Sequence, residues 1–138
     1  MPTKPMEKPL NEEQIHQAMP TALRVALRTL DAWGYSPDEM APVLGLSPTQ
    51  VQRYRATGLA EKSVTDDLTV RVSLILGIER ALEILLAEGT DIRDWINQPS
   101  DAPIFKGSSP KSVMLDGRVD DLREVRTYLD GWLSGDFA

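Results

Sequence analysis

Apolar residues recur at helical spacing along most of this 138-residue chain. Leu23, Leu27 and Leu30 follow one another at intervals of four and three, which places them on one face of a helix. Longer stripes of the same kind run from Leu68 to Leu86 and from Val119 to Leu133. No segment alternates between apolar and polar residues for long enough to indicate a strand. The pattern therefore predicts an all-α fold of seven or eight short helices.

Serine–proline pairs mark three expected helix starts, because serine is a favoured N-cap and proline suits the first helical turn. They are Ser36-Pro37, Ser47-Pro48 and Ser109-Pro110. Pro20 is expected in the first turn of the earliest long helix, after a short turn capped by Asn11. The proline-rich residues 1–19 are interpreted as a flexible N-terminal tail.

The segment from residue 37 to residue 56 fits a helix-turn-helix. Ala41 supplies the small residue that lets two helices pack closely, and Gly45, four residues later, suits the positive φ of the turn. Val51 and Tyr54 then fall at the positions that face inward from the second helix. Residues 20–62 are accordingly expected to form a DNA-binding domain.

The second helix of this motif would expose polar side chains that can reach base edges in the major groove. Glutamine pairs well with adenine and arginine with guanine. The alternative interpretation is a solvated polar face on a helical bundle that never touches DNA. The candidate DNA-binding residues are Ser47, Thr49, Gln50, Gln52, Arg53 and Arg55.

A single helix-turn-helix reads one half-site, so the protein is expected to act as a homodimer. The apolar stretch from Leu68 to Leu86 is the candidate dimer interface. The alternative is that this stretch is the central core helix, and both roles can coexist.

Charge is distributed unevenly around a net value of −6. Residues 1–58 carry 6 basic and 6 acidic groups, whereas residues 59–138 carry 9 basic and 15 acidic groups. Because acidic surfaces are repelled by phosphate, any contact with operator DNA is expected from the first half, and the acidic half is free to meet a basic protein surface.

Composition argues against an enzyme and against a metal site. The chain has no cysteine, and His16 is its only histidine, so neither a thiolate nor a multi-histidine metal site is available and a Ser-His-Asp triad is improbable. No cofactor is expected. The sequence shows no signal peptide and no run of 18 apolar residues, which predicts a cytoplasmic protein with no membrane partner.

The second half resembles the toxin-binding domain of the Xre/MbcA/ParS antitoxins, and the resemblance extends over residues 22–138. It is carried by Trp95-Ile96-Asn97, by Phe105-Lys106-Gly107-Ser108-Ser109-Pro110, by Met114-Leu115 and Gly117, and by the last helix with its Gly135-Asp136-Phe137-Ala138 ending. The loop from Gln98 to Pro103 departs from the family, which often has a proline–asparagine pair there.

The resemblance implies an antitoxin of a type II toxin–antitoxin system. It would bind a RES-type toxin that consumes NAD, cover the active site of that toxin, and repress its own operon. Residues 63–138 would then be a dimerisation and toxin-binding domain. The alternative is a stand-alone helix-turn-helix transcriptional regulator whose C-terminal half only dimerises. The candidate toxin-binding residues are Trp95, Phe105, Lys106, Arg118, Trp132, Leu133, Asp136, Phe137 and Ala138.

Overall fold

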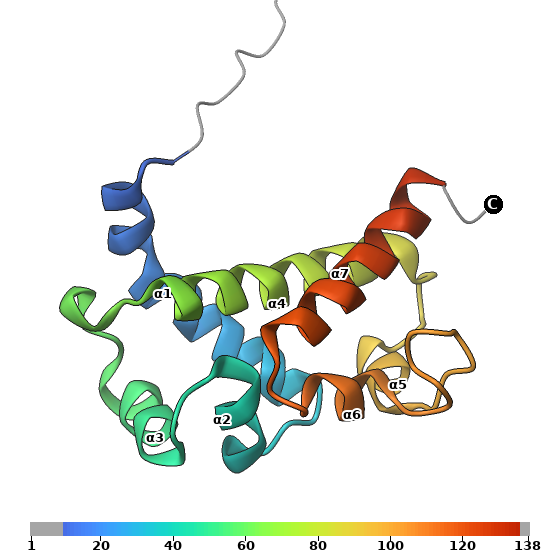
Figure 1. Ribbon diagram of the computed structural model, residues 1–138, viewed down its shortest axis with the longest axis horizontal. Helices are drawn as coiled ribbons and strands as arrows, with labels where there is room; N and C mark the ends of the chain where they lie inside the picture. Colours follow the sequence, from blue (N-terminus) through green and yellow to red (C-terminus); the bar gives the residue numbers. More distant parts are fainter. Residues whose placement is uncertain (1–9, 136–138) are drawn as a thin grey trace, which may run out of the picture.

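A computed structural model describes residues 10–135, and every regular element in that range is helical, which confirms the all-α prediction. Seven α-helices and one short 3-10 helix follow in chain order (Figure 1). Their bounds are α1 (Glu12–Ala32), α2 (Pro37–Leu44), α3 (Pro48–Thr57), η1 (Glu61–Ser63), α4 (Asp66–Leu85), α5 (Ile92–Asn97), α6 (Pro110–Met114) and α7 (Val119–Ser134).

The first helix begins earlier than the sequence pattern predicts. Asn11 caps it: its side chain accepts from the Gln14 amide at 2.8 Å, and the Gln14 side chain accepts from the Asn11 amide at 2.9 Å. Pro20 consequently lies inside α1 rather than in its first turn. The assignment of residues 12–19 to a tail was wrong, because this reciprocal cap and the burial of Met19 extend the helix. Residues 1–9 lie outside the described range.

The serine caps form as predicted. The side chains of Ser36 and Ser47 each accept a hydrogen bond from the backbone amide three residues on. The side chains of Glu39 and Gln50 in turn accept from the backbone amides of Ser36 and Ser47. Ser109 accepts from the Ser112 amide at the start of α6. Gly45 ends α2 with φ 65°, a left-handed conformation that glycine adopts without strain.

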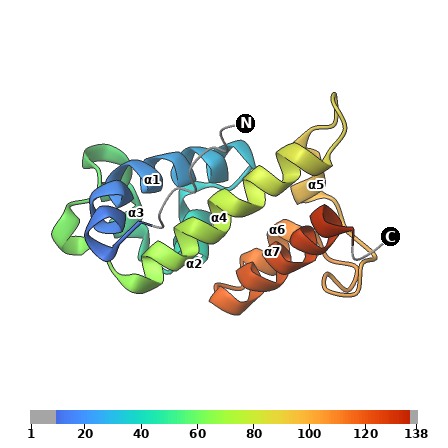
Figure 2. The same cartoon turned by 90° about the horizontal axis from the view of Figure 1, so that it is seen from above.

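The long helix α4 occupies the middle of the molecule (Figure 2). It packs against α1 on one side and α7 on the other. Leu68, Val72 and Leu82 on α4 are buried in these contacts. The stretch proposed as a dimer interface is thus largely used inside the monomer, which confirms the core-helix interpretation, and Ile84 is its only strongly exposed large apolar side chain within the described residues.

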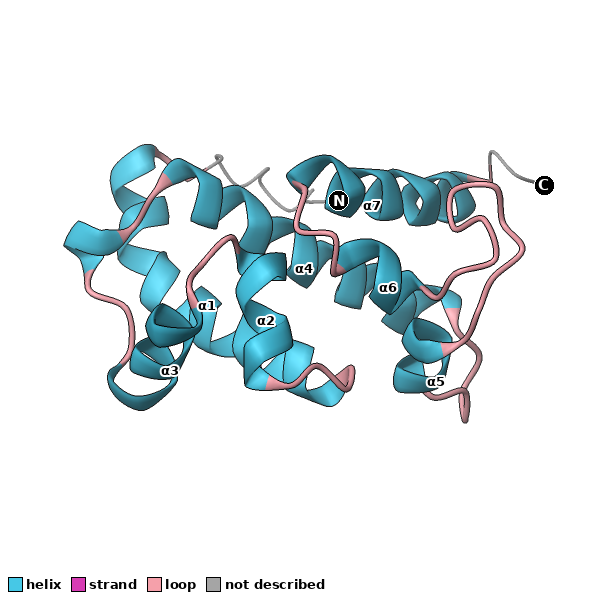
Figure 3. Ribbon diagram, turned by 60° about the horizontal axis from the view of Figure 1, so that its bottom comes forward, coloured by secondary structure: helices cyan, strands magenta, loops and turns pink. Residues whose placement is uncertain are grey.

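A single core runs through both halves of the chain. The buried side chains form one cluster from Met19 on α1 to Leu129 on α7. Figure 3 shows α1, α2 and α3 gathered at one end of α4, with α5 and α6 joined by a long loop at the other. The predicted division at residues 62 and 63 falls just before α4 and stays a prediction.

Candidate functional site

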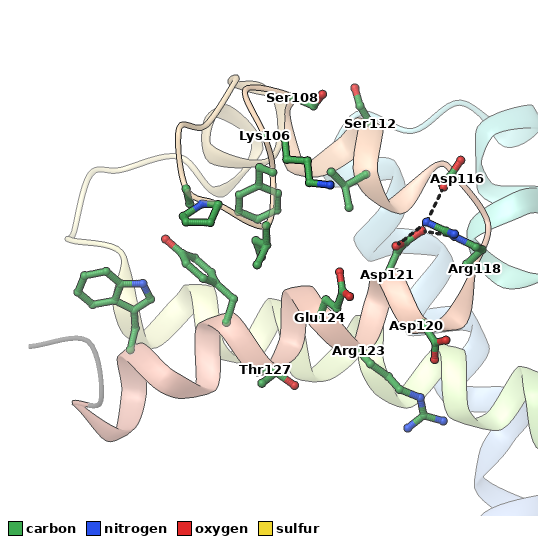
Figure 4. A pocket seen from close by; sticks show the side chains of 17 residues that line it. Lys106, Ser108, Ser112, Asp116, Arg118, Asp120, Asp121, Arg123, Glu124 and Thr127 are labelled. Carbon is green, nitrogen blue, oxygen red and sulfur yellow. Dashed lines mark hydrogen bonds and ion pairs between the residues drawn. The ribbon is translucent and has the colours of Figure 1, made fainter.

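An open groove of about 1440 Å³ lies between α7 and the segment that connects α5 to α7 (Figure 4). One wall is the loop of residues 102–108 together with α6, and the other wall is α7. The residues that form it are contributed by helices and a loop that are up to 30 positions apart in the sequence, so only the folded chain assembles them.

Backbone hydrogen bonds hold the loop wall in place. The Ser100 amide donates to the Ser108 carbonyl at 3.1 Å, and the Gly107 amide donates back to the Ser100 carbonyl at 3.0 Å. Lys106 adopts φ 50°, the only positive φ of a non-glycine residue within the described range. A left-handed lysine costs energy that the contacts of the closed loop must offset.

Four aromatic rings form a continuous row under the groove. Trp95 on α5 packs edge-on to Phe105 at 5.9 Å between ring centroids, Phe105 packs on Tyr128 at 5.6 Å, and Tyr128 packs on Trp132 at 6.4 Å. Phe105 is 1% exposed, whereas Trp132 is 46% exposed. The row therefore has a buried middle and a solvent-facing end on α7.

Charged side chains cluster where α6 turns into α7. Arg118 lies 3.2 Å from Asp116 and 3.2 Å from Asp121, and its guanidinium donates to both carboxylate oxygens of Asp121. The hydrogen bond from Arg118 to Asp121, together with the charges of Asp121 and Asp116, raises the pKa of Arg118. Figure 4 shows Lys106 and Glu124 extending into the groove from its two walls. The groove thus carries fixed charges of both signs around an aromatic base.

The predicted toxin-binding residues fall largely in this one region. Phe105, Lys106, Arg118 and Trp132 line the groove, whereas Leu133, the next residue on α7, is 40% exposed and is not part of the lining. Trp95 is half-buried beneath the loop. Phe105 is buried at the base of the groove, and its predicted contact with the toxin stays a prediction. The predicted residues Asp136, Phe137 and Ala138 lie outside the described residues.

The sequence interpretation missed Tyr128, which links Phe105 to Trp132. The signal was available, since Tyr128 precedes Trp132 by four positions and therefore lies on the same face of α7. It also missed Asp121, which is 7% exposed and fixes the Arg118 side chain.

The helix-turn-helix geometry of α2 and α3 matches its sequence pattern. Ala41, Val51 and Tyr54 are buried, as the pattern requires. The candidate contact residues Ser47, Thr49, Gln52, Arg53 and Arg55 are exposed.

One of these predicted contacts is already engaged. Gln50 is only half-exposed, and its side-chain oxygen accepts from the Ser47 amide at 2.9 Å. A bidentate pair with adenine would have to break this cap, and the predicted contact of Gln50 with a base stays a prediction. Arg53 lies over the Tyr54 ring, 5.3 Å from its centroid, which supports its side chain at the helix surface.

Neither a metal site nor a membrane helix is found in the described part of the chain. Residues 10–135 bring no three histidine, cysteine or acidic side chains together in a way that would hold a metal ion. None of the described helices is both long and apolar enough to cross a membrane.

Comparison with known proteins identifies the half of the molecule that contains the groove. Residues 81–135 match the family model for the antitoxin Xre/MbcA/ParS C-terminal toxin-binding domain. That span begins near the end of α4 and includes both walls of the groove. The chain is also 36% identical, over 117 residues, to "Uncharacterized protein y4oB" of Sinorhizobium fredii; the match extends over 85% of this chain and 88% of the relative. Residues 81–135 of this chain therefore form a toxin-binding domain of the Xre/MbcA/ParS antitoxin family.

Proposed function

We propose that this antitoxin inhibits a RES-type toxin, which consumes NAD, by covering the toxin's active site with the groove and the adjoining end of α7. The observation that carries the proposal is the exposure of Trp132, which lines the groove, and of its neighbour Leu133 on α7, inside the span that matches the toxin-binding domain. Large aromatic side chains on a surface are the usual anchors of protein interfaces, because their burial contributes much of the binding energy. Both partners are cytoplasmic in this proposal.

Charge supports the same assignment. An active site that binds NAD has to hold a pyrophosphate and is expected to present arginine or lysine. Residues 59–138 carry six more acidic than basic groups, and the groove lining has four acidic side chains against three basic ones. An acidic surface that meets a basic pocket favours rapid and specific association. Asp136, Phe137 and Ala138 belong to the proposed contact, although they lie outside the described residues.

Protection of cells tests the proposal. The chain is co-expressed with the toxin encoded beside it, and growth is compared for the wild type, Trp132→Ala and Val25→Ala. Val25 is a matched control, since it is 42% exposed but lies on α1, outside the groove and the matched span. We expect Val25→Ala to protect like the wild type and Trp132→Ala to protect poorly. Full protection by Trp132→Ala would contradict the assignment of the contact, and no protection by the wild type would favour the stand-alone regulator.

We also propose that α3 binds operator DNA and that the chain represses its own operon as a homodimer. Thr49, Gln52 and Arg53 support this, since they share the exposed side of α3 opposite the buried Val51 and Tyr54. Replacing Arg53 with alanine is expected to weaken operator binding by about 1–3 kcal/mol, concentrated at one base position if the side chain reads guanine. The affinities of the wild type and Arg53→Ala are measured for operators in which one base pair at a time is changed. Unchanged affinity would remove α3 from the interface.

A further inference from the structure

A second hollow, of about 460 Å³, lies between α1 and the C-terminal end of α3, far along the chain from the toxin-binding groove. Arg24 and Arg28 enter its lining from α1, and Arg55 enters from α3. All three side chains belong to exposed residues. We call the hollow with these three arginines the arginine pocket.

The arginine pocket carries charge that the rest of the described chain does not neutralise. Within residues 10–135, the ion pairs involve Arg71, Lys111, Arg118 and Arg126, and none involves an arginine of the pocket. Asp31 also lines the hollow, but no arginine lies within ion-pair distance of it in the described residues. The hollow therefore holds three positive charges and one negative charge.

Two of these charges repel each other within one helix. Arg24 and Arg28 are four residues apart on α1, a spacing that places like-charged side chains beside each other and destabilises an isolated helix. An anion bound between them and Arg55 would relieve that repulsion. Arginine is also the side chain best suited to phosphate, because its planar guanidinium donates two parallel hydrogen bonds.

The place of the pocket beside α3 indicates which anion it meets. A helix that enters the major groove has a phosphodiester strand along each side, because the groove is only about 12 Å wide. Thr49, Gln52 and Arg53 make up the exposed face of α3, and at about 100° per residue Arg55 lies roughly 110° around the helix from the middle of that face. If that face meets the bases, Arg55 points toward the flank of the helix, where α1 adds two more cations.

We propose that the arginine pocket binds the phosphate backbone of operator DNA and so extends the DNA contact from α3 to α1. The proposal rests on the DNA binding proposed above. It assigns to Arg24 and Arg28 a role that the helix-turn-helix pattern alone does not indicate, and it explains how a chain with a net charge of −6 holds DNA. Contacts to phosphate set register and strength and carry no base preference.

Salt dependence of DNA binding tests the proposal. The double variant Arg24→Gln/Arg28→Gln is compared with the wild type on operator DNA and on unrelated DNA between 50 and 200 mM salt. Each lost phosphate contact reduces the slope of log K against log salt by about 0.9, so the affinity ratio across this range should be about 12-fold smaller for the double variant. Both DNAs should show the same change. Arg80→Gln is the matched control, because Arg80 is an exposed arginine on α4.

The outcomes distinguish failure of the pocket proposal from failure of the proposed DNA binding. If the double variant keeps the wild-type slope, the pocket proposal is wrong while DNA binding by α3 stands. If the wild type binds no DNA, both are wrong. If the variant binds DNA normally but fails to protect cells from the toxin, or if only inorganic phosphate titrates the pocket, the pocket serves another ligand.

Folding is checked through the charge-preserving variant Arg24→Lys/Arg28→Lys, which should keep most of the slope. A loss of slope in that variant together with a lowered melting temperature would assign the arginines to stability instead.

Discussion

Arg71 donates a hydrogen bond from its guanidinium to the carbonyl oxygen of Gly117, 2.9 Å away. The same nitrogen lies 3.3 Å from the Pro42 carbonyl and 3.2 Å from the Val43 carbonyl, at the C-terminal end of α2. One buried side chain of α4 thus joins the end of α2 to the turn that begins α7, next to the groove. The two halves of the chain are held together by shared polar contacts as well as by a shared core.

Replacing Arg71 with methionine is expected to destabilise the protein by about 2–3 kcal/mol. Methionine keeps most of the apolar contact, but the Val43 and Gly117 carbonyls lose their donor, and a buried polar group left unpaired costs about 1–3 kcal/mol. Denaturant unfolding measures the change. Asp67→Asn is the control: it removes only the exposed partner of Arg71, 2.9 Å away, and should cost less than about 1 kcal/mol. Equal effects of the two substitutions would contradict the role given to the carbonyl contacts.

Local signals along the chain predicted the elements better than the contacts between them. Caps such as Ser36 and Ser47 are encoded within four residues, so the helix starts they mark are correct. The predicted start of α1 at Pro20 was wrong. A proline is compatible with a first turn, but the earlier cap at Asn11 and the burial of Met19 decide where α1 begins.

The site was predicted in part for the same reason. Aromatic residues in the second half indicated an interface region, but their order in space depends on how the loop of residues 102–108 packs on α7. Nothing in the local sequence distinguishes the burial of Phe105 from that of Trp132, yet Phe105 is buried and Trp132 is exposed. The arginine pocket joins α1 to α3, so no local pattern contains it.

Gly77 marks the point where α7 crosses α4. A Cβ atom added at Gly77 would overlap the Arg126 guanidinium, which is also paired with Asp130 at 2.9 Å. Alanine at this position gains helix propensity of about 0.8–1 kcal/mol but displaces that side chain. We therefore expect Gly77→Ala to stabilise the protein more in an Arg126→Ala background than in the wild type. A double-mutant cycle of unfolding free energies measures the difference, and identical effects in both backgrounds would refute the proposed crossing contact.

Glu39 should make the stability of the protein sensitive to acid. Backbone hydrogen bonding at Ser36, aided by Lys111 at 3.2 Å, lowers the pKa of Glu39 below its ordinary value. A lowered pKa in the folded state contributes stability above the ordinary glutamate range, and this contribution is lost as the pH falls through the lowered value. The variant Glu39→Gln keeps a capping side chain but loses the charge. Its melting temperature should lie below that of the wild type at pH 7 and approach it in acid; a constant difference would show that the charge does not matter.

Glu79 should have the opposite effect from Glu39 on how stability depends on pH. Trp33 donates to its carboxylate at 2.6 Å, but burial raises the pKa of Glu79 above its ordinary value. A raised pKa in the folded carboxyl group means that stability falls as the pH rises through the interval between the ordinary and the raised value. Glu79→Gln keeps an acceptor for Trp33 without a charge. Relative to the wild type, this variant should gain stability as the pH rises from acid to neutral, and thermal melts across that range would expose the reverse trend if the assignment is wrong.

Titration of toxin activity tests whether the groove and Trp132 contact the toxin. The purified toxin encoded beside this gene is assayed for NAD consumption while wild-type chain, Trp132→Ala or Val25→Ala is added. Loss of a buried aromatic anchor costs roughly 2 kcal/mol or more, and each 1.4 kcal/mol is a tenfold change in affinity. We therefore predict inhibition by the wild type and Val25→Ala at similar concentrations, and a requirement for at least about tenfold more Trp132→Ala. Equal inhibition by all three chains would contradict the contact between Trp132 and the toxin. Uninhibited NAD consumption in the presence of the wild type would contradict inhibition of this toxin by the chain.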